Sequence, residues 1–190
     1  MASIQKINLF KQRDKCQPDC GKRNKYYQSC DPRIKGKLKH FDKKLYDLYD
    51  KQARAELKRH LGDGITDNPD PYGEDMIVDT DLIPYTFIEV QVYGTWDNIF
   101  PYDEPYIYER KMRFDDNTLF VCFNSKYTKA IIFDKTSISL KKYRANTCEY
   151  VHHVPWEKAL LIDASDLNYD IIKNHSNSSN NAKIWTYDSR

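Results

Sequence analysis

Apolar and polar residues alternate through the middle of the chain, as they do along half-buried β-strands. The strands predicted from this pattern are residues 74–79, 86–93, 106–114, 118–124 and 129–134. The first two flank the short segment TDLIPY and predict a β-hairpin. We therefore expect a sheet at the centre of the protein.

A long amphipathic helix is predicted before the sheet, over residues 31–64. Asp31 can cap it, Pro32 suits its first turn, and Gly62 and Gly64 can end it. Its predicted core stripe, at three- and four-residue steps, consists of Leu38, Phe41, Leu45 and Leu48. A long helix followed by several strands predicts an α/β or mixed α+β fold.

The length of 190 residues is enough for one hydrophobic core. We predict a basic N-terminal arm over residues 1–30, an α/β domain over residues 31–170 and a polar C-terminal tail over residues 171–190. A short helix is predicted at residues 155–167, and the tail, rich in Asn and Ser, need not pack.

Charge is unevenly distributed, although the formal net charge is only +2. The first 40 residues hold eleven Lys and Arg against three Asp and Glu, a balance of +8. Residues 63–116 hold fourteen acidic residues against three basic ones, a balance of −11. Phosphate binding needs cations, so the acidic segment cannot hold nucleic acid unaided, but it can hold a divalent metal ion.

No segment approaches the roughly 20 apolar residues of a membrane span, and the first ten residues lack the apolar core of a secretory signal. We expect no membrane partner and an intracellular protein of the cytoplasm or nucleus. The abundance of Tyr, Asn and Lys is typical of an AT-rich genome and would suit a viral protein, in which case the viral factory or the virion is a further location.

Five cysteines without a signal peptide predict reduced thiols. A zinc site built from Cys16, Cys20, Cys30 and His40 is an alternative, but no second close pair of ligands supports it. An unstructured arm is the simpler interpretation.

Asp75, on the first strand of the hairpin, and Glu89 and Gln91, on the second, can converge if the hairpin forms in the obvious register. Glu56, near the end of the helix, can approach from the side. Carboxylates that meet at one point repel one another unless a cation lies among them. Mg²⁺ is the natural cation, because it takes oxygen ligands and is held by one or two carboxylates.

The segments AELKRHLG, PYGEDMIV and YTFIEVQV follow one another in a pattern of helix with Glu, strand with Asp, and strand with Glu-x-Gln. This order resembles the PD-(D/E)xK nuclease superfamily. The resemblance implies a restriction-endonuclease-like mixed sheet flanked by helices, with Gln91 at the place of the catalytic Lys. It also implies that Glu56, Asp75 and Glu89 ligate a metal ion or orient its ligands, Asp75 and Glu89 being the expected ligands.

Gln91 departs from the family pattern, because it carries no charge. A neutral amide can still orient a water molecule by hydrogen bonding. A cation from elsewhere can replace the missing Lys, and Lys111, in YERKMRF on a candidate neighbouring strand, is the first choice.

By this resemblance the chain is expected to hydrolyse phosphodiester bonds of DNA, with RNA a weaker candidate, using Mg²⁺ or Mn²⁺. A homodimer is one arrangement that would cut both strands. The predicted nucleic-acid-binding residues of the basic region are Lys22, Arg23, Lys25, Arg33, Lys35, Lys37 and Lys39.

Simpler interpretations stand beside each feature. Glu-x-Gln can be the solvent-facing side of an amphipathic strand, Asp75 can cap a turn, and Glu56 can pair with Arg59 or His60. Two other functions therefore stay open: a non-catalytic nucleic-acid-binding or packaging protein, and a structural or interaction protein.

Four aromatic residues are candidates for stacking on unpaired bases or, alternatively, for core packing: Trp96, Tyr102, Tyr106 and Tyr108. The neighbouring His152 and His153 are expected to point in opposite directions on a strand, one into the core and one to the surface.

Overall fold

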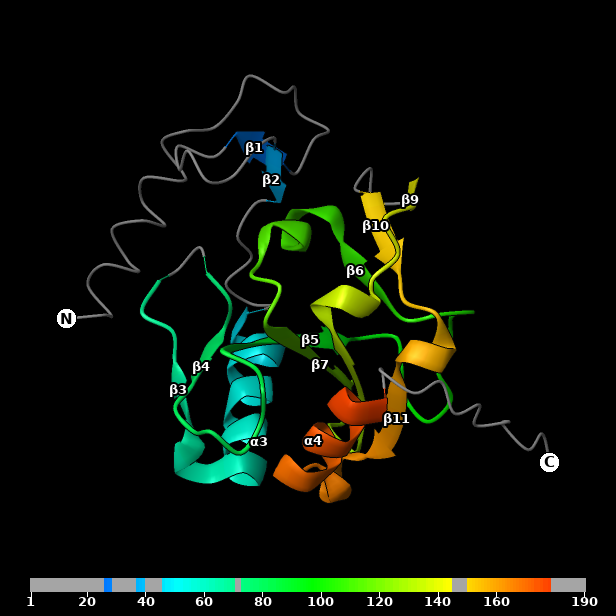
Figure 1. The fold of residues 1–190 in the computed structure, drawn as a ribbon. Helices are drawn as coiled ribbons and strands as arrows, with labels where there is room; N and C mark the ends of the chain where they lie inside the picture. Colours follow the sequence, from blue (N-terminus) through cyan, green and yellow to red (C-terminus); the bar gives the residue numbers. More distant parts are fainter. Residues whose placement is uncertain (1–25, 29–36, 40–45, 71–72, 145–149, 179–190) are drawn as a thin grey trace.

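The computed structural model describes residues 26–28, 37–39, 46–70, 73–144 and 150–178 (Figure 1). Its strands are β1 Tyr26–Gln28, β2 Lys37–Lys39, β3 Ile65–Asp67, β4 Met76–Val78, β5 Phe87–Tyr93, β6 Tyr106–Tyr108, β7 Thr118–Asn124, β8 Lys129–Asp134, β9 Lys142–Arg144, β10 Tyr150–His153 and β11 Leu160–Asp163. Its helices are the π-turn η1 Tyr46–Asp50, the α-helices α3 Lys51–Leu61 and α4 Tyr169–Ser178, and the 3₁₀ turns η2 Gly62–Gly64, η3 Glu109–Arg113, η4 Lys135–Ser137, η5 Trp156–Lys158 and η6 Ala164–Asp166.

The central sheet is mixed and has six strands in the order β11-β8-β7-β5-β4-β3. Only β5 and β7 run parallel, and the other neighbouring strands are antiparallel. The predicted hairpin is present as β4 and β5, and the strands predicted at residues 118–124 and 129–134 are β7 and β8. The described residues thus form a mixed α/β fold with few helices, as the sequence predicts.

The two faces of this sheet bury two separate clusters of side chains. On one face, Ile88 and Val90 of β5 pack with Ala53 and Leu57 of α3 and with Ile172 of α4. The opposite face carries Phe120, Cys122, Ile131 and Phe133 of β7 and β8. A second sheet, in the order β6-β10-β9, lies on that side, away from α3 and α4 (Figure 1).

The long helix predicted over residues 31–64 is wrong in its first half. Residues 37–39 form β2, which pairs with β1, and α3 begins only at Lys51. Leu48, predicted in the core stripe, is 50% exposed, whereas Ala53, Leu57 and Leu61 are buried. The buried side of α3 is therefore the one marked by Ala53, Leu57 and Leu61, and the predicted stripe does not mark it.

Two other predicted elements are wrong. The strand predicted over residues 106–114 ends at Tyr108, and η3 follows it. The helix predicted over residues 155–167 is two 3₁₀ turns around β11, which pairs with the edge of β8. A short apolar run such as ALLI fits either structure by periodicity alone, and pairing with a sheet edge decides between them.

The predicted boundary of the polar tail, between residues 170 and 171, falls inside α4. Ile172 is fully buried and His175 is 9% exposed, so the α/β domain extends beyond the predicted boundary. Three-residue spacing of two buried side chains is enough to dock this polar helix on the sheet. In the part of the chain that the structure describes, no helix is long and apolar enough to cross a membrane.

Candidate functional site

The pair Glu89 and Gln91 lies on the inner face of β5, beneath the second sheet. Glu89 is only 6% exposed and Gln91 only 8%. Ile88 and Val90 point to the other face, towards α3. The interpretation of Glu-x-Gln as a solvent-facing strand edge is therefore wrong, and these polar groups need partners inside the protein.

Lys111 supplies the main partner. It lies in η3, directly after β6, and is 9% exposed. Its Nζ is 2.8 Å from Oε1 of Glu89 and donates a 3.1 Å hydrogen bond to Oε1 of Gln91. The structure thus brings together the predicted acid, the predicted amide and the predicted cation, although Lys111 comes from a 3₁₀ turn and not from a strand.

Asp75 joins this group from the end of β4. The ladder between β4 and β5 stops at Met76 opposite Ile88. One residue earlier, Oδ2 of Asp75 accepts a 3.0 Å hydrogen bond from the backbone N–H of Val90 and so continues the pairing with a side chain. Oδ1 of Asp75 accepts from Arg54 of α3. The sheet opens here, and groups from both of its faces meet at the opening.

The carboxylates at this point act on one another. Burial and the charge of Asp75 raise the pKa of Glu89 to about 7, against the lowering effect of Lys111 and Arg54. Burial and Asp75 also raise the pKa of Asp50, the residue that precedes α3. Burial lowers the pKa of Lys111, but Glu89 and Asp75 outweigh it, so the net shift is upward and Lys111 stays charged.

Gln91 links this cluster to the second sheet. Its Oε1 accepts from Lys111, and its Nε2 donates a 3.4 Å hydrogen bond to the backbone carbonyl of Tyr106. Lysine at position 91 could not accept a hydrogen bond from Lys111 and would place two ammonium groups side by side. The neutral amide at position 91 is therefore matched to a cation that arrives from η3.

Glu56, predicted to approach the site, is turned away from it. Its Oε1 pairs with Nη2 of Arg59 and, at 3.2 Å, with Nε2 of His60, and Arg59 is the main cause of its lowered pKa. Arg54, two residues earlier, faces the site instead. A change of two positions rotates a side chain by about 200° around a helix.

Asp50 and Arg54 are the site residues that sequence reasoning missed. Asp50 directly precedes α3, and Arg54 follows four residues later in its first turn. This i, i+4 pair of opposite charges was a usable signal, but the family resemblance pointed to Glu56.

The donor atoms of the site suit a hard divalent cation. Asp75 and Glu89 offer carboxylate oxygens, and two carboxylates plus water molecules are a usual way to hold Mg²⁺. Both carboxylates already carry a cationic partner, so a metal ion has to share or displace Arg54 and Lys111. Among the described residues, no group of three or more His, Cys, Asp or Glu side chains could hold a metal ion. A metal ion held by Asp75 and Glu89 alone would need water molecules as its other ligands.

A comparison with protein-family models found no match, and comparisons with curated proteins and with solved structures found no significant similarity.

Several predicted residues lie outside the described part of the chain. They are Lys22, Arg23, Lys25, Arg33, Lys35, Cys16, Cys20, Cys30 and His40. For Lys37 and Lys39 the backbone is described as part of β2, but the side chains are not. Cys122 is a buried free thiol. As expected, His152 is buried while His153 reaches the surface.

The raised pKa of Glu89 predicts that the protein loses stability as the pH rises. A carboxyl group whose pKa is higher in the folded than in the unfolded state binds its proton more tightly when folded. Its contribution is present below the ordinary value of 4.5 and is lost as the pH rises towards about 7. We expect the Glu89→Gln variant to show a flatter profile of unfolding free energy between these pH values, measured by urea denaturation. Equal slopes for wild type and variant would contradict the shift.

Proposed function

We propose that this protein is a metal-dependent nuclease-like enzyme of the PD-(D/E)xK type that hydrolyses phosphodiester bonds of DNA. The observation that carries the proposal is the meeting of Asp75, Glu89, Gln91 and Lys111 at the opening between β4 and β5. The order of helix, Asp before one strand and Glu-x-Gln on its hairpin partner is the order that the family resemblance requires.

In the proposed mechanism, Asp75 and Glu89 would hold a divalent metal ion. Bound there, the ion would supply polarisation of the scissile phosphate and a lowered pKa of the attacking water molecule. Lys111 keeps a permanent positive charge near the phosphate and offsets negative charge that builds up during the reaction. Gln91 holds the Lys111 ammonium in position from β5.

The proton of Glu89 sets a condition on this mechanism. Its carboxyl group has a pKa of about 7, and a metal ligand has to be deprotonated. Metal binding should therefore release a proton and be weaker in mildly acidic solution.

One observation favours a second function, a non-catalytic nucleic-acid-binding protein. Asp75 and Glu89 are both paired with cations, as they would be in a purely structural cluster. In that case the basic N-terminal region would bind nucleic acid and the cluster would only hold the sheet together.

The test is cleavage of labelled single-stranded, double-stranded and branched DNA with Mg²⁺ or Mn²⁺. We expect Asp75→Asn, which keeps an acceptor for the N–H of Val90, to abolish cutting. Its control is Asp163→Asn, since Asp163 is an exposed partner of Lys129 at the far edge of the sheet. DNA that is bound but not cut would support the binding protein. No binding at low salt would support the structural or interaction protein.

The proposed partner, location and oligomeric state follow from this activity. DNA is the proposed partner, and the protein is proposed to act inside the cell. A homodimer remains the arrangement proposed for cutting both strands.

A further inference from the structure

The second sheet carries a row of aromatic rings on one face. Directly opposite residues of antiparallel strands share a face. Tyr108 and Tyr143 both lie opposite Val151, and Tyr106 lies opposite His153, two residues further along β10. These side chains therefore line one face, whereas Ile107 and His152, on the other face, are buried.

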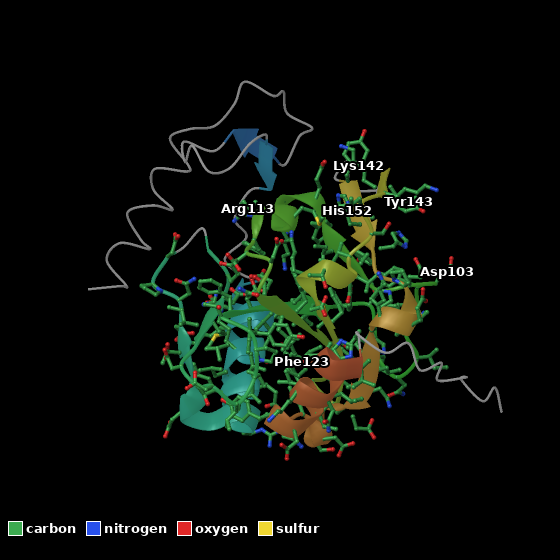
Figure 2. All side chains as sticks on the ribbon, viewed as in Figure 1. Asp103, Arg113, Phe123, Lys142, Tyr143 and His152 are labelled. Carbon is green, nitrogen blue, oxygen red and sulfur yellow. The ribbon has the colours of Figure 1, made fainter. Side chains whose placement is uncertain are left out.

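The rings follow one another closely. The ring centroids of Tyr143 and His153 are 4.6 Å apart, those of His153 and Tyr106 are 6.5 Å apart, and those of Tyr106 and Tyr108 are 5.9 Å apart. Tyr102, which is 39% exposed, adds a further ring 5.2 Å from Tyr106. Tyr143 is 42% exposed and extends from β9 at the margin of the molecule (Figure 2).

Cations accompany the rings. Lys141 lies 5.1 Å from the ring centroid of Tyr143, and the guanidinium of Arg110 lies 4.4 Å from that of Tyr108. Acidic residues border the face as well, among them Glu104, which is paired with His153, and Glu109, which is paired with Lys142. Stacking surfaces combined with cations are the chemistry that binds unpaired bases and their phosphates.

The row leads to the candidate site. Tyr93, on the same face of β5 as Gln91, donates a 2.6 Å hydrogen bond to the carbonyl of Tyr106 and accepts a 2.9 Å hydrogen bond from its N–H. Gln91 donates to the same carbonyl. Arg110, beside Tyr108, precedes Lys111 and acts by its charge on Asp50. Backbone and side chains thus connect the end of the row to the acidic cluster.

We propose that the aromatic face of the β6-β10-β9 sheet binds a nucleic-acid strand with unpaired bases and presents it to the site at Asp75, Glu89 and Lys111. The inference rests on the proposed function in naming its substrate class, a strand that is single-stranded next to the scissile bond. A fully paired duplex buries its base faces in its own stack and cannot use the rings.

The chain offers a matched pair of variants for the test. Tyr143 and Tyr150 are 42% and 41% exposed, on opposite faces of the same sheet. Each ring has a neighbouring lysine, Lys141 at 5.1 Å and Lys142 at 4.6 Å from the respective ring centroid. Only Tyr143 belongs to the aromatic row.

The experiment measures the affinity of the full chain for a fluorescent oligothymidylate by anisotropy, with chelator in place of divalent metal. We expect tighter binding to this strand than to a duplex of equal length. Tyr143→Ala should weaken it by about 5-fold to about 150-fold, the effect of one lost stacking contact, while Tyr143→Phe and Tyr150→Ala keep the wild-type affinity.

Equal binding of strand and duplex, or equal losses in Tyr143→Ala and Tyr150→Ala, would overturn the inference. Because no metal is present, absence of cleavage cannot produce either result. Conversely, metal-dependent cutting without a preference for unpaired bases would support the proposed function and contradict only the proposed role of the aromatic face in substrate binding.

Discussion

Replacing Glu89 by Gln is expected to lower metal-dependent cleavage of DNA by about 10²- to 10³-fold, the size of loss that follows removal of one preorganised electrostatic group from a reaction site. Gln has the shape of Glu and still offers an oxygen to Lys111, 2.8 Å away in the wild type. The variant loses the negative charge that holds the metal ion but keeps most of the packing. Initial rates on a labelled substrate under metal saturation would measure the effect.

The matched control is Glu56→Gln. Glu56 is the acid that the family resemblance places at the site, but the structure pairs it with Arg59 and His60 on the side of α3. We expect this variant to cleave at the wild-type rate. An equal loss in Glu56→Gln would show that Glu56 acts at the site despite its pairing with Arg59 and His60. Full activity in Glu89→Gln would refute the proposed site.

Thermal unfolding separates a catalytic loss from a folding loss. The raised pKa of Glu89 means that the carboxylate form destabilises the fold near neutral pH. Gln removes this cost but leaves the buried Lys111 without its closest anion, so Glu89→Gln should unfold below the wild type yet stay folded at the assay temperature while losing cleavage. A variant that is inactive because it is unfolded at the assay temperature would indicate a structural role for Glu89.

The strands that hold the site could be predicted from alternation together with short apolar runs. β5 alternates, β7 and β8 carry β-branched and aromatic runs of strand length, and the hairpin of β4 and β5 follows from the turn between them. The burial of Glu89 was not predictable, because alternation cannot tell a solvent-facing polar row from one that lies under a second layer. The β6-β10-β9 sheet that covers it depends on pairing between residues more than 40 positions apart.

The side of the helix that faces the site could not be predicted, for a different reason. The predicted core stripe ends at Leu48, which is 50% exposed, whereas the buried side of α3 is marked by Ala53, Leu57 and Leu61. Arg54 pairs with Asp75, where an acid was expected. Lys111 could be found because the site needs a cation and Gln91 does not supply one. The electrostatic need identified the residue even though its predicted strand is a 3₁₀ turn.

Replacing Lys111 by Met should lower the free energy of unfolding by about 3–5 kcal/mol in alkaline solution, because it leaves the buried Glu89 carboxylate without its closest cation. The loss should be smaller near neutral pH, because the pKa of Glu89, about 7 beside Lys111, rises further without it and the carboxyl group takes up a proton. Urea denaturation of wild type and variant at both pH values would measure it.

The double variant Glu89→Gln, Lys111→Met should recover most of the lost stability, since removing both charges of a buried pair is far less costly than removing one. As a surface control, Lys129→Met breaks the exposed pair with Asp163 and should cost no more than about 1 kcal/mol. Additive losses in the double variant would mean that Glu89 and Lys111 do not act as a pair, and the cation of the proposed site would then have to be sought elsewhere. Recovery of stability would show that the cost in Lys111→Met comes from the unpaired Glu89 carboxylate and not from lost packing of the Lys111 side chain.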